Sequence, residues 1–320
     1  KIVYERTTST VKDFDYVYWS SPVEGQKLGV LSPSSDKYWS WSDYYWVPAV
    51  AGETMIEGKG YIARVPRYVT SQTVEFKGTP NNGDVTIAAQ GNAMSNLIGN
   101  PYPSAIDAED FMVENQDIIP TGGMLAFWTH TTKRTLSGDK TEYVYEADDY
   151  GFFNLAGGIA TNYTPLSPGG SAPDGTIAAG QSFMVGSETA IKNIFKFTNS
   201  MRIGDDVAGS QNGHFFRQTN TKKTAKKEKN RIWLNLTNDG GAFKQLLVGY
   251  ITGATNGADK LFDGTSRNSN AYVDFYSVMD SEKYTIQGRG LPFNEEDQVP
   301  LGYKSTIEGT FQIGIDRTDG

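Results

Sequence analysis

Apolar and polar positions alternate along much of the chain. Residues 310–316 and residues 231–237 each place their large apolar side chains on one face and small or polar side chains on the other. This period of two is typical of half-buried strands in antiparallel sheets. Residues 243–251 are apolar on both faces, which predicts a central strand. Turn signals separate such segments, at residues 81–84, 168–170, 239–241 and 256–257.

Helical periodicity is scarce, and its best case is residues 104–115, which follow an Asn-Pro-Tyr-Pro step. Ser104 can cap the first turn, and Asp107 stands three residues later, as in a capping box. Ile106 and Phe111 would then lie on a short apolar face. The sequence therefore predicts one short helix here.

The N-terminal part of the chain contains a degenerate repeat. Residues 18–23 and residues 97–102 both read as an apolar strand that stops at a small-polar-proline step. Residues 57–65 resemble residues 179–185, and a further strand pattern follows each of them. This spacing indicates either two similar sandwich units or one larger pseudo-symmetric sandwich. The two units would span about residues 1–90 and 91–205.

Composition adds weight to an all-β fold. Glycine (35 residues) and proline (13) mark turns, and aromatic residues (12%) suit half-buried pleated surfaces. We expect antiparallel β-sandwich domains, jelly-roll or Ig-like, with very little helix. The net charge of −8 disfavours broad binding to nucleic-acid phosphates. The chain has no cysteine and two histidines, which excludes disulfides and thiolate metal sites and leaves little for multi-histidine ones. No apolar run reaches the ~18–20 residues of a membrane helix.

Residues 206–230 interrupt the alternating pattern. They are polar and glycine-rich at first, and Lys and Arg then dominate residues 217–231, where Glu228 is the single acid. This composition predicts a basic, solvated linker or exposed loop between residues 1–205 and a C-terminal β-domain at residues 231–320. The alternative is a patch for an anionic partner such as lipopolysaccharide. Because no aromatic residue is interleaved with the lysines, we do not expect a nucleic-acid partner.

Several short sequence stretches, taken together, are typical of one protein family. The most specific is Ile-Gly-Asn-Pro-Tyr-Pro at residues 98–103, within residues 96–105. In combination they resemble the C-terminal β-rich region of large secreted surface or adhesin-like proteins of gliding-type Bacteroidota, exported by the type IX secretion system. The resemblance covers nearly the whole chain. Its other stretches are residues 16–23, 58–62, 180–183, 197–202, 214–217, 229–236 and 301–305.

The resemblance implies a non-catalytic module that lies just before a C-terminal sorting domain. It implies an extracellular location at the outer membrane surface of a Gram-negative bacterium, with the type IX export machinery and the cell surface as partners and no membrane-spanning segment. Family members continue through further strands, whereas this chain stops at Gly320. The last domain is therefore expected to be incomplete or cleaved, with an edge strand that is exposed or covered by a partner.

The densest chemical feature is the aromatic strip at residues 38–46. Alternation places Trp39 and Trp41 on one face, and a platform of these rings with Trp46 could stack on sugar rings while Asp43 accepts hydrogen bonds from hydroxyl groups. The alternative is a hairpin whose indoles fill the core, because tryptophan is usually heavily buried.

A calcium site is the one cofactor that the sequence suggests. Asn256, Asp259 and Asp263 supply oxygen ligands in one loop, and Asp205, Asp206 and Asn212 supply them in another. Neither loop has the EF-hand spacing. The alternative is that these side chains accept hydrogen bonds from their own backbone. We expect no bound cofactor.

Catalytic signals are weak. His130 and His214 have no Gly-x-Ser-x-Gly element, and the acids at residues 142–149 look like a solvated surface. An enzyme would need a pocket with two carboxylates, or His130 beside an acid. We therefore expect a structural or adhesive module that acts as a rigid stalk near the sorting signal. The alternatives are a carbohydrate-binding module that uses residues 38–46 and a self-assembling filament subunit.

Overall fold

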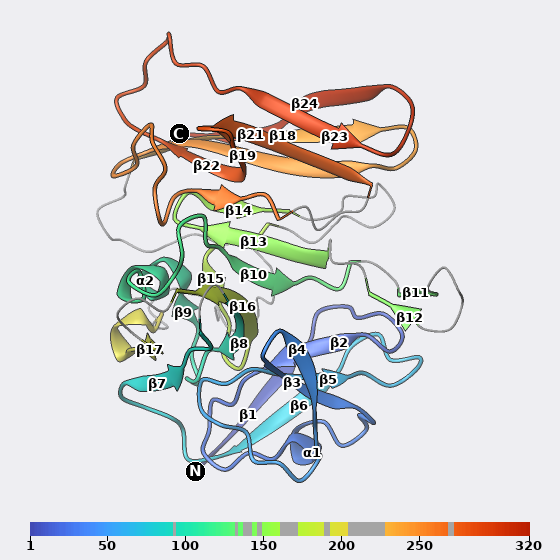
Figure 1. Ribbon diagram of the computed structural model, residues 1–320. Coiled ribbons are helices and arrows are strands. Elements are labelled where there is room, and N and C mark those ends of the chain that lie inside the picture. The colour runs from blue at the N-terminus through green and yellow to red at the C-terminus, as the bar shows by residue number, and fades with distance from the viewer. Residues whose placement is uncertain are drawn as a thin grey trace.

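The computed structural model confirms the all-β prediction. It describes residues 1–91, 94–131, 134–136, 143–145, 149–160, 172–188, 193–203, 228–267 and 272–320. In this part of the chain every strand pairing is antiparallel except that of β19 with β22. Figure 1 shows three layers, with the N-terminal strands at one end and the C-terminal strands at the other. No helix within the described ranges has both the length and the apolar character needed to cross a membrane.

The first unit covers residues 2–78. A four-stranded sheet in the order β2-β5-β3-β4 packs beside the β1-β6 pair. Trp19, Tyr61 and Phe76 are fully buried between them, because alternate residues of each strand point into the core. The elements are β1 (Ile2–Thr7), β2 (Tyr16–Trp19), α1 (Leu28–Leu31), β3 (Tyr38–Ser42), β4 (Tyr45–Ala49), β5 (Tyr61–Arg64) and β6 (Thr73–Gly78).

The second unit covers residues 85–203. Its five-stranded sheet has the order β8-β16-β10-β13-β14, and the pairs β7-β17, β9-β15 and β11-β12 flank it. The elements are β7 (Val85–Ala88), β8 (Met94–Gly99), β9 (Ile106–Asp107), α2 (Ala108–Glu114), β10 (Leu125–Trp128), β11 (Thr135–Leu136), β12 (Tyr143–Val144), β13 (Tyr150–Asn154), β14 (Gly157–Ile159), β15 (Thr176–Ile177), β16 (Ser182–Ser187), β17 (Ile194–Phe197) and the 3-10 turn η2 (Asn199–Met201).

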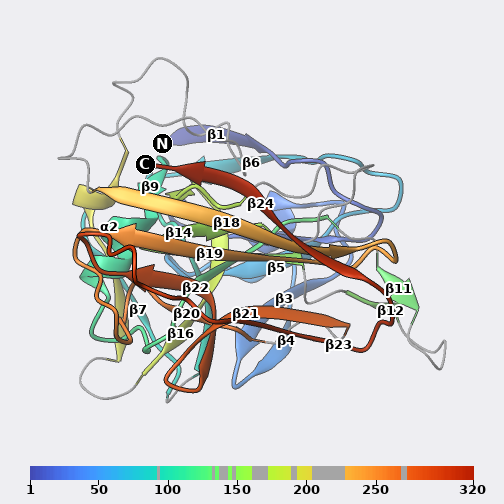
Figure 2. The ribbon, with the colours of Figure 1, turned by 90° about the horizontal axis from the view of Figure 1, so that it is seen from above.

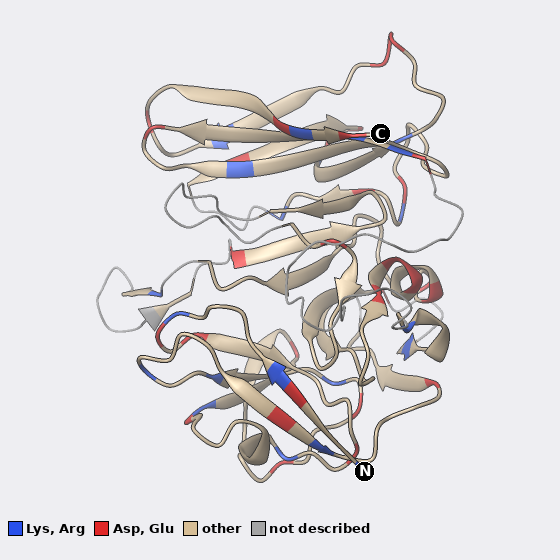
Figure 3. Ribbon diagram, turned by 180° about the vertical axis from the view of Figure 1, so that it is seen from behind, with Lys and Arg blue, Asp and Glu red and all other residues tan. Residues whose placement is uncertain are grey.

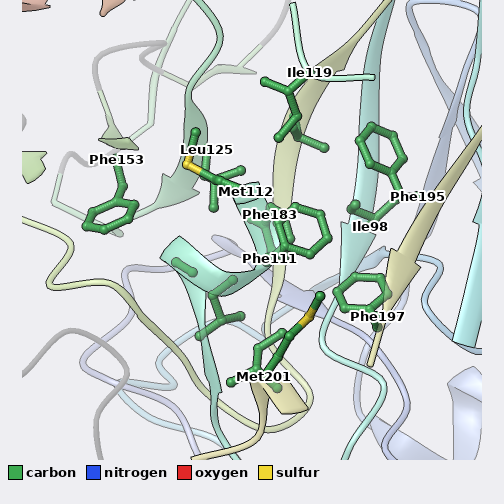
Figure 4. Close-up of a cluster of buried hydrophobic side chains, with 14 of the residues drawn as sticks. Ile98, Phe111, Met112, Ile119, Leu125, Phe153, Phe183, Phe195, Phe197 and Met201 are labelled. Atoms are coloured by element: carbon green, nitrogen blue, oxygen red, sulfur yellow. The ribbon is translucent and has the colours of Figure 1, made fainter. Parts of the chain in front are cut away.

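Helix α2 anchors the core of the second unit. The Phe111 ring lies 5.3 Å from that of Phe183 and 4.9 Å from that of Phe197, measured between centroids (Figure 4). The helix begins three residues later than predicted, because Asp107 rather than Ser104 is its N-cap. Asp107 accepts hydrogen bonds from two backbone amides of the first turn. Acidic residues gather on this helix (Figure 3), and those of the first turn favour the positive end of the helix dipole.

The two units share one plan of strand pairing. Trp19 pairs with Tyr61 in the first unit, and Ile98 pairs with Phe183 in the second. Both sheets then continue through a third and a fourth strand, β3-β4 in the first unit and β10-β13 in the second. Strand β7 pairs with β17, so residues 85–88 pack with the second unit.

The units are also tied to each other by equivalent backbone contacts. Ser20 donates its N–H to the Gly180 carbonyl at 2.8 Å, and Gly99 donates to the Gly58 carbonyl at 3.0 Å. Gly58 and Gly180 both have φ near +73°, a region that favours glycine. These paired contacts relate the units by an approximate two-fold axis.

The C-terminal strands form one seven-stranded sheet with the main order β23-β21-β22-β19-β18-β24. Strand β19 lies inside the sheet, as its apolar pattern predicts, and β24 lies along β18 at the sheet edge (Figure 2). The strands are β18 (Lys229–Asn238), β19 (Phe243–Ile251), β20 (Gly264–Thr265), β21 (Val273–Met279), β22 (Glu282–Arg289), β23 (Leu301–Ser305) and β24 (Phe311–Asp319).

A buried contact joins this sheet to the second unit. Phe152 and Ile159 of the second unit pack against Trp233, Leu247 and Ile286, and we call this cluster the joint. Each such side chain contributes roughly 1.5–3 kcal/mol when fully buried. Of the predicted linker at residues 206–230, residues 206–227 lie outside the described ranges, and β18 already includes its last two residues.

Candidate functional site

An aromatic seam fills the contact between the two units. Its buried members are Tyr18 and Ile62 of the first unit and Leu97 and Trp128 of the second. The partly buried members are Tyr16, Trp39, Trp41, Trp46, Tyr145, Tyr150 and Met184. The seam contains Trp39, Trp41 and Trp46, the three indoles of the aromatic strip at residues 38–46.

The seam repeats one ring pair. Trp41 of β3 stands opposite Trp46 of β4, with ring centroids 4.9 Å apart and planes at 77°. Trp128 of β10 stands opposite Tyr150 of β13 at the equivalent position, with centroids 5.1 Å apart and planes at 72°. Both pairs have the edge-to-face geometry that aromatic rings favour. The two units thus meet through equivalent aromatic surfaces.

Trp39, Trp41 and Trp46, the expected sugar platform, all belong to this seam and are only partly buried. Trp41 donates its indole N–H to the Ser95 carbonyl of the second unit at 2.8 Å, and Trp39 donates to the Tyr16 hydroxyl at 3.1 Å. The Trp41 hydrogen bond therefore links the two units, whereas the Trp39 hydrogen bond stays within the first unit. Asp43, the fourth predicted ligand-binding residue, lies apart from them in the exposed turn of the hairpin.

Two tyrosines of the seam form a hydroxyl pair. The oxygens of Tyr18 and Tyr150 lie 2.6 Å apart. Burial raises the pKa of Tyr150 to about 12 and raises the pKa of Tyr18 well above its ordinary value. Both phenols are therefore neutral at physiological pH, and they act as a hydrogen-bonded contact between the units.

His130 lies beside an acid at the edge of the seam. Its Nδ1 atom is 2.7 Å from Asp15 Oδ2, and both side chains are almost fully buried. Asp15 Oδ1 also accepts from the Trp128 indole N–H at 3.0 Å and from the Tyr16 backbone N–H at 2.7 Å. A carboxylate beside a histidine orients the imidazole in hydrolases. Here the carboxylate is also hydrogen-bonded to two further donors, which suits a buried structural contact between the units.

The backbone on both sides of this contact is unusual. Phe14 and His130 have φ of 59° and 60°, in the left-handed region that bulky residues rarely adopt. The Phe14 ring lies under two guanidinium groups, those of Arg64 at 4.9 Å and Arg134 at 4.3 Å from its centroid. Tyr145 donates its hydroxyl to the Phe14 carbonyl at 2.6 Å. The strained turn is thus held from both units.

The side-chain oxygens in the loop of the predicted calcium site accept hydrogen bonds from backbone N–H groups, both of the loop itself and of the end of β22. Asp263 is fully buried and accepts from the backbone N–H groups of Asp259 at 2.6 Å and Gly288 at 2.8 Å. Asn256 Oδ1 accepts from the Gly290 N–H at 3.0 Å. Burial raises the pKa of Asp263 to about 6. The oxygens predicted as calcium ligands serve here as acceptors for backbone amides.

The structure describes only one residue of the remaining candidate sites. His214 and the second oxygen-rich loop (Asp205, Asp206 and Asn212) lie outside the described residues. Of the acids at residues 142–149, Asp149 is described and buried, and its Oδ1 accepts from the Thr131 hydroxyl. Within the described ranges no group of three or more His, Asp or Glu side chains is placed to hold a metal ion.

The sequence identified several residues of the seam but not the residues that they contact. The alternation of residues 38–46 marks the face on which Trp39 and Trp41 lie, but nothing local shows that a second unit covers it. His130 is conspicuous as one of two histidines, whereas Asp15 stands 115 positions away with no motif to connect them. Tyr44 and Tyr45 belong to the same strip and are exposed in the structure. No local pattern in the sequence indicates this exposure.

A family model described as a domain of unknown function (DUF8693) matches residues 1–320. No curated protein and no solved structure matches the chain.

Proposed function

We propose that this chain, which belongs to the DUF8693 family over its whole length, is a non-catalytic structural module that acts as a rigid spacer in a secreted cell-surface protein. The strongest support is the continuity of its buried contacts. The aromatic seam joins the first unit to the second, and the joint around Trp233 joins the second unit to the C-terminal sheet. Strands β1 and β24 lie at opposite ends of this stack (Figure 1), which is the arrangement that a spacer needs.

The contacts in the seam favour a structural role over a catalytic one. Catalytic groups need a reacting atom within hydrogen-bond reach and a pKa near the working pH. Asp15 instead accepts three hydrogen bonds from neighbouring residues, and the Tyr18–Tyr150 pair stays protonated. These groups stabilise the contact between the units, as a load-carrying module requires.

The rigid-spacer proposal predicts a single end-to-end distance. The chain has no cysteine, so two cysteines can be introduced and spin-labelled without background. Val3 of β1 and Gln312 of β24 are exposed and lie in the outer layers. Pulsed electron–electron double resonance on a spin-labelled Val3→Cys, Gln312→Cys variant should give one narrow distribution of distances between the two labels.

The matched control is a Val3→Cys, Val50→Cys variant, in which both labels lie in the first unit. A distribution for Val3 and Gln312 that is as narrow as this reference supports the spacer. A distribution several times broader contradicts it, because the sheets would then move independently.

The cell-surface part of the proposal rests on the resemblance to surface proteins exported by the type IX system. An antibody raised against the folded chain should label intact cells that produce the native protein, and protease added outside those cells should remove the signal. Labelling that appears only after the cells are permeabilised contradicts a surface location.

A second candidate function is self-association through β24. Strand β24 occupies an edge of the C-terminal sheet, where unpaired backbone groups can pair with another chain. It also exposes Ile313 (51%) and Ile315 (66%) on the face that carries the buried side chain of Leu236. Proteins usually protect such edges with charged residues, proline or β-bulges. Residues 311–315 of β24 contain no charged residue and no proline, whereas its charges are confined to residues 316–319.

Light scattering coupled to size-exclusion chromatography tests this second candidate. A concentration-dependent dimer that Ile315→Lys abolishes supports it, with Val3→Lys on the edge strand β1 as the control. A monomer at all concentrations contradicts it.

A further inference from the structure

Strand β24 changes character near its middle. Ile315 and Arg317 pair with consecutive residues of β18, so Asp316 between them has no partner there and is the extra residue of a bulge. Beyond the bulge, Arg317 lies over the buried indole of the joint, with its guanidinium carbon 4.0 Å from the ring centroid. The strand is therefore regular and uncharged over residues 311–315, and bulged and charged over residues 316–319.

The regular half of β24 exposes apolar side chains that its neighbour β18 covers. Ile313 stands opposite Leu236 and Ile315 opposite Leu234, and residues directly opposite each other share one face of a sheet. Leu236 is fully buried and Leu234 is half-buried, whereas Ile313 and Ile315 are exposed. A Cβ atom added at Gly314 would meet no atom within 4 Å. Within the described ranges β24 pairs with β18 alone, so this apolar face ends at an uncovered strand (Figure 2).

Three other exposed end strands carry the residues that usually prevent pairing between molecules. Strand β1 contains Glu5 and Arg6, β4 contains Pro48 and β23 contains Lys304. Charges and proline on an end strand discourage a second chain from continuing the sheet. Residues 311–315 contain neither. This stretch is therefore suited to accept another strand, whereas the three other end strands are not.

Residues 311–315 are complementary to a second copy of themselves. In an antiparallel pair centred on Ile313, that residue faces its own counterpart, and Phe311 faces Ile315 of the second copy. Aromatic and β-branched side chains that stand directly opposite each other stabilise a sheet. A centre one residue later would bring the bulge at Asp316 into the pair, and a centre one residue earlier would leave Ile315 beyond the start of the other strand. The uncharged stretch thus favours one register.

We propose that a second copy of this chain binds along β24 as an antiparallel, two-fold symmetric pair centred on Ile313, which makes the two C-terminal sheets one continuous sheet. The proposal rests on the second candidate function above, and it specifies the strand and the register through which the copies associate. A two-fold pair closes after two copies, whereas pairing of β24 with a different strand of the next copy would give an open filament. Because the paired stretch is short, the dimer should dissociate on dilution.

Disulfide trapping on the full chain tests the centre of the pair, since the chain has no cysteine of its own. Residues directly opposite each other in an antiparallel pair are close enough for a disulfide. With oxidised glutathione, Ile313→Cys should therefore form a covalent dimer. The matched control is Val3→Cys on the end strand β1, which is also apolar and exposed. Ile313→Cys should react about tenfold faster or more, because pairing holds the two thiols at a high effective concentration.

Two further variants test the register. Gln312 and Gly314 are both exposed, and the proposed pair places Gln312 of one copy opposite Gly314 of the other. Gln312→Cys and Gly314→Cys should therefore link to each other when the two proteins are mixed. Each variant alone should link no faster than Val3→Cys, because its own counterpart lies two residues away along the second strand. Intact mass spectrometry distinguishes the mixed dimer from the two homodimers.

The possible outcomes separate this proposal from the candidate function on which it rests. Rapid linking of Ile313→Cys together with the mixed dimer supports the proposed pair. If light scattering shows a dimer but Ile313→Cys links no faster than Val3→Cys, the register is wrong and self-association stands. Assemblies larger than a dimer overturn the two-fold symmetry. A monomer at all concentrations, without rapid linking of any variant, overturns both the register and self-association through β24.

Discussion

His130 Nδ1 lies 2.7 Å from Asp15 Oδ2, and this buried contact joins residues that stand 115 positions apart in the chain. Asp15 belongs to the first unit and His130 follows β10 of the second. The Trp128 indole donates to the same carboxylate, so the acid links a strand end, an indole and an imidazole. A buried carboxylate with three donors is costly to disturb, because any donor left behind lacks water to replace the bond.

Asp15→Ala should therefore destabilise the protein strongly. Each buried donor that is left without its acceptor typically costs about 1–3 kcal/mol, and Asp15 accepts from three donors. Chemical denaturation monitored by tryptophan fluorescence would measure the change in the free energy of unfolding. Asp13→Ala is the control, since Asp13 is only partly buried and accepts one backbone hydrogen bond, from Tyr68. Equal effects of the two substitutions would contradict the role assigned to Asp15.

The first residue of α2 could not be predicted from local sequence. The capping-box spacing predicts Ser104 as the N-cap, with Asp107 as its partner three residues later. The structure uses Asp107, because Ile106 and Asp107 pair with Ile177 and Thr176 in the short β9-β15 ladder. That pairing spans about seventy residues, and local propensity contains no information on it.

The aromatic strip gives the same lesson for the candidate site. Alternation correctly places Trp39 and Trp41 on one face of β3, since period two is a local property of a strand. Whether that face meets solvent or another sheet depends on the second unit, whose Ser95 accepts from Trp41. The all-β class was predictable from residue pattern, whereas the contacts of the seam depend on long-range packing.

Gly99 should resist substitution, because the two units cross there. A Cβ atom added to Gly99 would lie 2.6 Å from the Ser20 Cβ and 2.7 Å from the Gln181 carbonyl oxygen. Overpacking of this kind costs about 1–3 kcal/mol. Gly99→Ala should lower the free energy of unfolding by that amount, measured by urea denaturation. Gly314→Ala is the control, since a Cβ there meets no atom within 4 Å, and a similar loss in both variants would contradict the crossing argument.

Asp263 should make stability depend on pH. Burial raises its pKa from 3.8 to about 6 in the folded state, so the folded protein binds this proton more tightly than the unfolded chain does. The stabilisation is complete below pH 3.8 and is lost as the pH rises through about 6. The loss from this one group is of the order of 3 kcal/mol.

Urea denaturation of the wild type and of Asp263→Asn from pH 4 to pH 7 measures this contribution. The difference in unfolding free energy between the two proteins should change across that range, because the variant has no carboxyl group at this position to titrate. Asp239→Asn, at an exposed turn, should follow the wild type. A constant difference between the wild type and Asp263→Asn would show that this carboxyl group titrates alike in the folded and unfolded states.

Trp233 should determine whether the C-terminal sheet unfolds together with the rest. Its indole is buried in the joint and donates to the Gly158 carbonyl at 2.9 Å. Trp233→Ala removes the largest side chain of the joint, and such truncations cost about 3–5 kcal/mol. Because the loss is confined to one interface, calorimetry should show the single transition of the wild type divide into two. Phe275→Ala truncates a buried ring of the same sheet outside the joint and should lower the midpoint without dividing the transition. A divided transition in the wild type itself would mean that the joint does not couple the sheets, and the rigid spacer would lose its mechanical basis.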